Sequence, residues 1–333
     1  MASGGPDRDR RDARSRLGAD ALSRNLGIGT ALPGLGADRD VIANDGGVIS
    51  LHALIVEPFQ TLAFMRAALV ACLALALMNG AVGTLLVLRR MSLDGEVLGH
   101  AVMPGAAVGF LYSGPSPLWL SLGGLASGLA VAALGGLIAR GGARRDVWLV
   151  AFYLVALSLG VALVAWRGSN IDVVRVLFGT VLAIDRSALL QMAAVSSVIV
   201  LVIAALYRPL AVGAFDPAFL RAVGARAPYG AVFSTLVVLG LVASFQAFGT
   251  LLAVGPMLLP AAAARCWGLG AAGSMALATG FGLAASVAGL LVSYHVSLPS
   301  GPAIVLAAGL LFGISLAVAN ALPRLTPMIW RGA

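Results

Sequence analysis

Long apolar runs separated by short polar segments organise the chain from residue 61 onward. A helix that crosses a membrane needs about 20 mostly apolar residues, and several runs have that length. They cover residues 62–88, 117–139, 147–166, 188–210, 229–252, 270–294 and 302–322. This pattern predicts an all-α fold, a polytopic bundle of transmembrane helices.

Two shorter apolar segments, about 95–112 and 253–267, interrupt their runs with proline. They contain Pro104, Pro256 and Pro260. Proline is tolerated in a membrane helix where surrounding protein satisfies the backbone, so we expect broken or kinked spans here. The segment 171–185 is too short and too mixed to cross, and we expect it to be re-entrant or interfacial. The pattern predicts eight or nine crossings.

The composition agrees with a multi-pass protein of a bacterial cell membrane. Hydrophobic residues make up 60% of the 333 positions and charged residues only 11%, against about 25% charged in a soluble domain. The chain has no lysine, which a P-loop ATPase requires. It also lacks the His-Glu-x-x-His, Gly-x-Ser-x-Gly and Cys-x-x-Cys motifs. We therefore predict that it is not an enzyme and does not bind nucleic acid.

Residues 1–57 differ from the rest of the chain. They are rich in Arg, Asp and Gly without sustained periodicity, which is typical of a disordered arm or of an over-extended start, and no apolar signal-peptide core follows. Residues 58–333 form the predicted membrane domain.

Arginine sets the predicted orientation, because cytoplasmic loops carry an excess of positive charge. Alternating spans put eleven arginines on one side, Arg89, Arg90, Arg140, Arg144, Arg145, Arg208, Arg221, Arg226, Arg265, Arg324 and Arg331. Only three or four remain for the other side, namely Arg167, Arg175 and Arg186, with or without Arg66. The first side is predicted to be cytoplasmic, with the C-terminus inside and residue 60 outside.

An acid and an imidazole stand four residues apart in the segment LDGEVLGHAVMPG. On a helix, Glu96 and His100 share one face, and Met103 follows one turn on. A carboxylate and an imidazole are a partial ligand set for a divalent transition metal such as zinc or manganese. Two ligands from one helix leave a site open and weak, as a conduit requires. We expect Pro104 and Gly105 to kink or break the helix just beyond.

Spacing alone leaves a second interpretation open, in which the pair is an acid–histidine hydrogen bond that satisfies two buried polar groups. His295, near the outer end of a predicted span, is either a surface residue or part of an outer mouth for the cation. Small residues with GxxxG spacing, Gly124 to Gly128 and Gly309 to Gly313, predict close helix packing.

The segment AFDPAFLRAVGARAP, residues 214–228, lies on the predicted cytoplasmic side. Asp216 is a natural N-cap, Pro217 suits the first helical position, and Gly224 is placed for a C-cap. The helix between them would be about two turns long. Such a short capped helix indicates either docking to a partner or an ordinary ordered loop.

The segment RRMSLDGEVLGHAVMPGAAVGFL resembles the signature of metal-type ABC transporter permeases, the membrane subunits of zinc, manganese and iron importers. Further matching segments follow in the family's order. They are SNIDVVRVLFGTVLAI, AFDPAFLRAVG, SFQAFGTLLAVGPMLLPAAAAR and LPSGPAIVL. The similarity covers roughly residues 58–322.

The resemblance implies an ATP-driven, binding-protein-dependent importer of zinc or manganese, or of iron, with the cation held transiently and no permanent cofactor. Glu96, His100 and Met103 would line the translocation path. Residues 214–226 would form the coupling helix that docks on the ATPase, through Phe215, Asp216, Pro217, Arg221 and Gly224. The implied partners are a cytosolic ATP-binding subunit, an extracytoplasmic metal-binding protein and a second permease subunit, identical or related.

Two alternatives remain open, a permease for siderophores or cobalamin and a proton-coupled secondary carrier that uses Glu96. The chain also departs from the family pattern. Glu96 stands where the family usually has Asp, which extends the carboxylate by one methylene, and Arg145 stands where an acid is usual.

Overall fold

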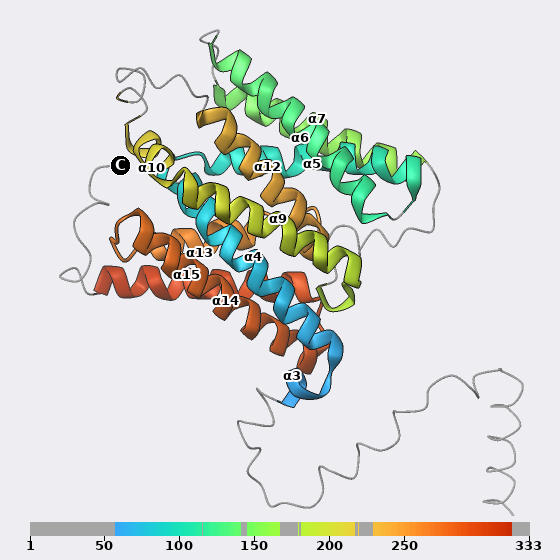
Figure 1. Ribbon diagram of the computed structural model, residues 1–333, viewed down its shortest axis with the longest axis vertical. Coiled ribbons are helices and arrows are strands. Elements are labelled where there is room, and N and C mark those ends of the chain that lie inside the picture. Colours follow the sequence, from blue (N-terminus) through green and yellow to red (C-terminus); the bar gives the residue numbers. More distant parts are fainter. Residues whose placement is uncertain are drawn as a thin grey trace, which may run out of the picture. The chain divides into compact units, whose positions relative to one another are not determined.

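The computed structural model describes residues 57–114, 116–140, 145–166, 179, 181–216, 219 and 229–321, and these ranges contain helices and no strand (Figure 1). The elements are α3 (Glu57–Thr61), α4 (Ala63–Leu88), α5 (Ser92–Ser113), α6 (Pro117–Arg140), α7 (Arg145–Trp166), η2 (Val181–Ala183), α9 (Arg186–Ala205), α10 (Tyr207–Phe215), α12 (Tyr229–Phe248), α13 (Gly255–Arg265), α14 (Ala271–Val296) and α15 (Ser300–Ala321). The predicted all-α class is confirmed. The predicted arm lies outside the described residues except for Glu57, which begins α3.

The helices α4, α9 and α12 lie in the middle of the bundle, and a group of helices flanks them on either side (Figure 1). The central helix α4 packs against α9 and α12. On one side α5 packs against α6 and α7, and on the other α13, α14 and α15 pack against one another. Because α4 also contacts α13 and α14, and α12 contacts α5 and α6, the central helices join the two flanking groups.

The core of the bundle lies along α4 and α12. Leu75 and Met78 on α4, and Phe233 and Phe248 on α12, are at most 1% exposed. A helix that is apolar on all sides is typically buried among others, and α4 fits that rule. Large apolar side chains such as Leu306 on α15 are exposed instead, as expected of surfaces that face lipid.

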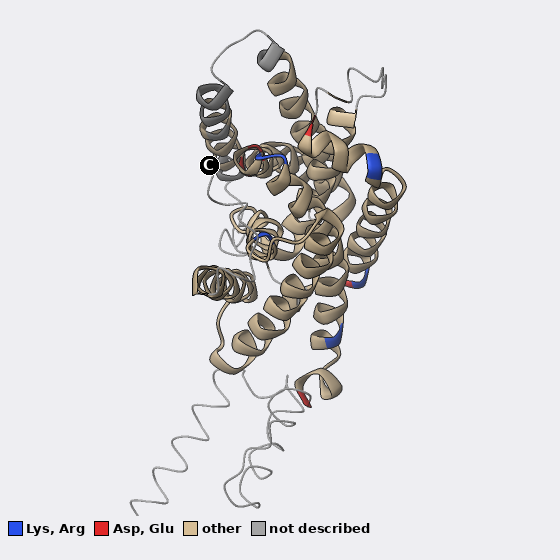
Figure 2. Cartoon of the chain, turned by 90° about the vertical axis from the view of Figure 1, so that its left-hand side faces the viewer, with Lys and Arg blue, Asp and Glu red and all other residues tan. Residues whose placement is uncertain are grey.

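Six helices are long and apolar enough to cross a membrane, by length and composition, within the described ranges: α4, α6, α9, α12, α14 and α15. Charged residues appear as a few short blue and red segments on otherwise tan helices (Figure 2). The helices α5 and α7 coincide with two further predicted spans. The multi-pass architecture is therefore as predicted, whereas the total of eight or nine crossings stays a prediction.

The proline-containing segment 253–267 forms only a short helix. α13 has 11 residues, so at 1.5 Å per residue it is about 16 Å long and cannot cross a hydrocarbon layer of about 30 Å alone. The segment before it starts inside the protein, since Gly249 is buried and Thr250 is 1% exposed, whereas Leu251 is exposed. This agrees with the broken span predicted here.

The helix α9 begins at a side-chain cap. The carboxylate of Asp185 accepts the backbone N–H of Ala188 at 3.1 Å and the hydroxyl of Ser187 at 2.6 Å. The Ser187 hydroxyl, followed by the Ala188 N–H, lowers the pKa of the Asp185 carboxyl. The start of α9 at Arg186 is thereby fixed by the residue that precedes it.

The helix α5 runs through Pro104 to Ser113, so the predicted break at Pro104 and Gly105 is wrong, although a bend there stays a prediction. Contacts with α6 hold this region together. The Ser127 hydroxyl donates to the Ala101 carbonyl at 2.6 Å. A Cβ on Gly105 would collide with the backbone carbonyl of Gly123, and the reverse is also true. Neighbouring helices commonly stabilise proline in a membrane helix in this way.

Close packing at the first GxxxG pair is confirmed, and it occurs within one chain. Added Cβ atoms at Gly124 and Gly128 would lie within 3.4 Å of Val102 side-chain atoms, from α5, and the closer contact at Gly128 is with Val238 of α12. Cβ atoms on Gly309 and Gly313 would meet no atom of the described residues within 4 Å.

Replacing Gly105 by Ala is expected to destabilise the protein, because the added methyl group has to displace the backbone of α6. Overpacking of this kind costs about 1–3 kcal/mol. The measurement is the thermal unfolding midpoint of the purified protein in detergent. Gly280→Ala on α14 is the matched control, since a Cβ there has no neighbour within 4 Å. Equal midpoints for the two variants would contradict the close approach of α5 and α6.

Candidate functional site

The residues predicted to handle a metal all lie on α5. This helix begins at Ser92 with Asp94 in its first turn, where a carboxylate interacts favourably with the helix dipole. His100 lies eight positions after the start, about 12 Å along a helix about 33 Å long. The imidazole is therefore about a third of the way along α5 from its predicted cytoplasmic end.

Glu96 and His100 differ in their exposure. Glu96 is exposed, whereas His100 is 6% exposed. Because they are one turn apart on the same face, the carboxylate forms the open end of the pair and the imidazole the buried end. Pro104 has no N–H for the carbonyl four residues earlier, which is that of His100. The backbone carbonyl of His100 therefore lacks its usual hydrogen-bond donor within the helix.

Met103 is placed differently from the acid–histidine pair. It is 4% exposed, and a Cβ on Gly160 of α7 would lie 3.1 Å from its sulfur and 2.8 Å from its Cγ. The thioether therefore packs against α7. This contact explains the burial of Met103 without a role as a metal ligand, which stays a prediction.

Asp94 is a buried acid that the sequence interpretation did not select as a site residue. It is 7% exposed. Asp94 and Glu96 are two positions apart, so at about 100° per residue their side chains leave the helix about 200° apart. The carboxylates of Asp94 and Glu96 therefore face different surroundings. Their difference in burial could not be read from the spacing.

His295 lies at the exposed end of α14, where its ring is 5.1 Å from that of Tyr294 in an edge-on arrangement. The main neighbours of α14 are α4, α13 and α15, whereas those of α5 are α6 and α7. The structure therefore does not bring His295 into the group that contains His100. A role at an outer mouth stays a prediction.

No group of three or more His, Cys, Asp or Glu side chains that could hold a metal occurs among the described residues. The acid–histidine pair of α5 therefore supplies only part of a coordination shell within this portion of the chain. A cation at the pair would need water, backbone oxygen or a second subunit for its other ligands.

The predicted docking segment begins where α10 ends. Phe215 is the last residue of α10 and is 65% exposed, and Phe219 is 53% exposed. The Asp216 carboxylate accepts the backbone N–H of Phe219 at 2.9 Å, which is the bond expected of an N-cap. Pro217, Arg221 and Gly224 lie outside the described residues.

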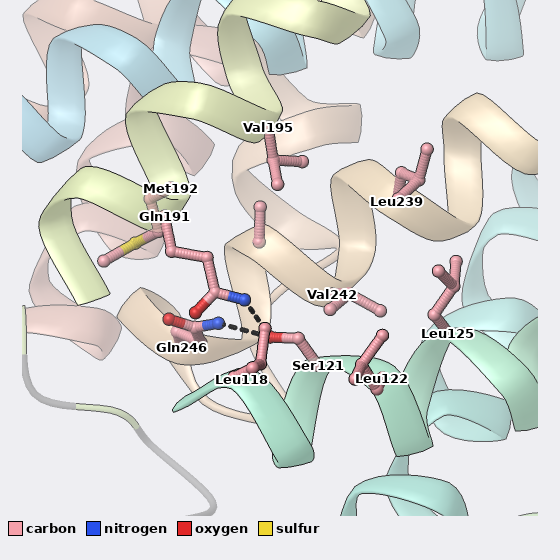
Figure 3. Close-up of a pocket in the computed structure, with 11 residues that line it drawn as sticks. Leu118, Ser121, Leu122, Leu125, Gln191, Met192, Val195, Leu239, Val242 and Gln246 are labelled. Atoms are coloured by element: carbon pink, nitrogen blue, oxygen red, sulfur yellow. Dashed lines mark hydrogen bonds between the residues drawn. The ribbon is translucent and has the colours of Figure 1, made fainter. Parts of the chain in front are cut away.

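A polar cluster joins three helices beside an apolar pocket of about 140 Å³ (Figure 3). Ser121 on α6 accepts hydrogen bonds from Gln191 of α9 at 2.8 Å and from Gln246 of α12 at 2.7 Å. The Ser121 hydroxyl in turn donates to the Pro117 carbonyl at 2.8 Å. Leu122 and Val242 are among the aliphatic residues that line the pocket.

This cluster was not predicted from the sequence, although a signal for it exists. Gln191 and Gln246 are amides within apolar runs, and a buried amide in a membrane helix needs a polar partner. The sequence does not show which partner, because Ser121 is 70 and 125 positions away from them. The sequence thus shows that these amides need polar partners, and only the fold shows which residues are the partners.

Known proteins resemble this chain over most of its length. Residues 61–319 match the family described as the ABC 3 transport family. The manganese import system permease protein ScaB of Streptococcus parasanguinis is 31% identical over 266 residues, which cover 79% of this chain and 94% of that protein. The manganese transport system membrane protein MntC of Listeria monocytogenes is 28% identical over 263 residues, covering 79% and 93%.

A solved structure is also similar. It is that of PsaBC from Streptococcus pneumoniae in complex with Fab. The similarity has a TM-score of 0.73 at 28% sequence identity and covers 82% of this chain and 99% of the other. The similarity in structure therefore extends over nearly all of that chain.

Replacing Ser121 by Ala is expected to lower the stability of the bundle, because two amides lose their shared acceptor. Interhelical hydrogen bonds in membranes contribute about 0.6 kcal/mol each, so the loss should be about 1 kcal/mol. The measurement is again the thermal midpoint in detergent. Ser197→Ala is the control, since that exposed hydroxyl donates within α9, to the Ala193 carbonyl. An unchanged midpoint for Ser121→Ala would show that the cluster does not hold the three helices.

Proposed function

Because the chain belongs to the ABC 3 transport family, we propose that it carries manganese(II) across the membrane as the permease of an ATP-driven, binding-protein-dependent importer. Membership makes it a metal-type ABC permease, a transport subunit whose ATP hydrolysis takes place on a separate subunit. The names of the two relatives, both manganese systems, favour manganese over zinc or iron. The permease body would begin near residue 58, and residues 1–57 would be an appended arm.

The observation that carries the proposal is the exposed carboxylate next to a buried imidazole on α5. A charged side chain facing hydrocarbon costs several kcal/mol, so the face of Glu96 has to meet water or protein. A second permease subunit or an aqueous path would supply that environment. Carboxylate oxygen and imidazole nitrogen are ligands that manganese(II) accepts.

The incompleteness of the ligand set suits a transport path. A cation at Glu96 and His100 would complete its shell with water or with groups from the second subunit, so it could be released. His100 would hold the ion at the buried end of the pair, and Glu96 would accept it toward the cytoplasmic end of α5. Glutamate in place of the family's usual aspartate would move the carboxylate outward by one methylene and keep an oxygen ligand at this position.

The proposed contact with the ATPase is the segment that starts at Phe215. Exposed Phe215 and Phe219 offer apolar surface on either side of the Asp216 cap. Aromatic anchors commonly dominate such interfaces. Docking of residues 214–226 in a groove of the ATPase would link nucleotide binding to the membrane helices.

Replacing Glu96 by Ala or His100 by Ala is expected to reduce manganese uptake to background, because each change removes one of the two side-chain ligands. Glu96→Asp, which restores the family's usual residue, should keep uptake. The measurement is radioactive manganese accumulation in cells that lack their own copy of the chain, with membrane content checked by immunoblot. Normal uptake by both alanine variants would contradict the assignment. If the unmodified protein takes up zinc but not manganese, the proposed ion is wrong, and the proposed site at Glu96 and His100 is not contradicted.

Replacing Phe215 by Ala is expected to weaken association with the ATPase subunit about tenfold, since an aromatic anchor is lost. The measurement is co-purification of the ATP-binding subunit at increasing dilution. Phe64→Ala is the control, because Phe64 is an exposed phenylalanine at the start of α4, 42% exposed, away from the docking segment. If the two variants retain the ATPase equally, the docking role of this segment is wrong.

A further inference from the structure

Arg89 is a cation held between three helices at the end of α4. Its guanidinium carbon lies 4.1 Å from the ring centroid of Phe233 on α12. Its Nη2 donates to the carbonyl of Leu210 on α10 at 3.3 Å. Phe233 and Leu210 are both buried core residues, at most 1% exposed. The side chain therefore connects the end of α4 to both α10 and α12.

The placement of Arg89 is not one that stability alone would favour. Its Nε is buried and has no hydrogen-bond partner among the described residues, and a buried donor without an acceptor is unfavourable. Burial also lowers the pKa of its guanidinium. The next residue, Arg90, is exposed. Arg89 therefore makes interhelical contacts and loses solvation, whereas Arg90 stays exposed to solvent.

The turn that carries Arg89 is short and tightly bonded to α5. Backbone N–H groups of Arg89, Arg90 and Met91 donate to carbonyls in the last turn of α4, and the Gly95 N–H donates to Met91. A Cβ on Gly95 would lie 2.6 Å from a methyl group of Leu86, so the first turn of α5 packs closely on the end of α4. Close contacts therefore connect the turn at Arg89 to the start of α5.

The other partner of Arg89 leads to the docking segment. Leu210 and Phe215 belong to the same helix, α10, and five positions separate them by about 7.5 Å along its axis. α10 packs against both α4 and α12. One continuous set of contacts thus runs from the start of the docking segment through α10 and Arg89 to the helix that carries Glu96 and His100.

We infer that Arg89 is a positioning residue that transmits movement of α10 to α5, so that nucleotide-driven motion at the docking segment reorients the acid–histidine pair. This inference rests on the proposed docking of residues 214–226. Arg89 does not contact the cation. It acts by keeping α10, α12 and the α4–α5 turn in one moving unit, a physical link of the kind that coupling between distant sites requires.

The test compares Arg89→Gln with Arg90→Gln in the assembled transporter, reconstituted in vesicles with its ATPase and binding protein. Both variants remove one positive charge from the same turn, so any effect on membrane orientation is matched. We expect Arg89→Gln to keep ATPase association and ATP hydrolysis while manganese uptake falls about tenfold, within the usual range for coupling between sites. Arg90→Gln should keep uptake. Arg89→Lys should recover part of it, because the ammonium can still lie over Phe233 and donate one hydrogen bond.

A second measurement does not depend on the metal. Spin labels at Leu93 on α5 and Leu306 on α15, both exposed, report the distance between the two flanking groups in a Cys266→Ser background. Locking the transporter in its ATP-bound state should change this distance in the unmodified protein and in Arg90→Gln, but not in Arg89→Gln.

The outcomes separate this inference from the proposed function. If the labels in Arg89→Gln respond to ATP as in the unmodified transporter, Arg89 does not transmit the movement and the inference is overturned. If Arg89→Gln loses the ATPase altogether, its role is in assembly and the inference is likewise overturned. If the unmodified transporter itself shows no response to ATP, the docking proposal fails first, and the transmission route fails with it.

Discussion

A polar side chain placed among apolar membrane helices has to find its partners within the protein, because the surrounding hydrocarbon offers none. In the described part of this chain, several such side chains lie where helices meet. Asn79 of α4 accepts the hydroxyl of Ser244 of α12 at 3.2 Å. Ser121 joins α6 to α9 and α12, and Arg89 joins α4 to α10 and α12. These contacts fix the rotation of helices that apolar packing alone would leave less defined.

The same constraint shapes α5. Its acid–histidine pair sits in a helix that is held closely by α6 at Gly105 and by α7 through Met103. The support is closely packed, whereas the pair itself would offer a cation two side-chain ligands, of which Glu96 is exposed. A stable scaffold around an incomplete ligand set is what transient binding of a cation needs. A complete set of protein ligands would stabilise the bound state and slow release.

The two ends of the described bundle differ in their chemistry. At one end, the cation Arg89 contacts α10, and the capped turn at Asp216 and the exposed Phe215 and Phe219 lie at the end of α10 or just beyond it. At the other end of α5, the ring of Tyr112 lies 5.4 Å from that of Trp119 at the start of α6, and such aromatic residues are typical of a membrane interface.

The sequence by itself determined the helices, because hydropathy and segment length are local properties. The predicted spans coincide with α4 to α7, α9 and α12 to α15 to within a few residues, and the pairing of Glu96 with His100 follows from helical spacing alone. Four-residue spacing could not show that Glu96 is exposed and His100 buried, since that depends on which neighbours cover each side of α5.

Only the tertiary structure decided the rest. Proline at 104 predicted a break on local grounds, yet contacts from α6 keep the helix continuous. Arg89 reaches a carbonyl 121 positions away, and Ser121 binds amides from two distant helices. Such pairings depend on the rotation and depth of each helix, which are set by all of its neighbours together and by no single stretch of sequence.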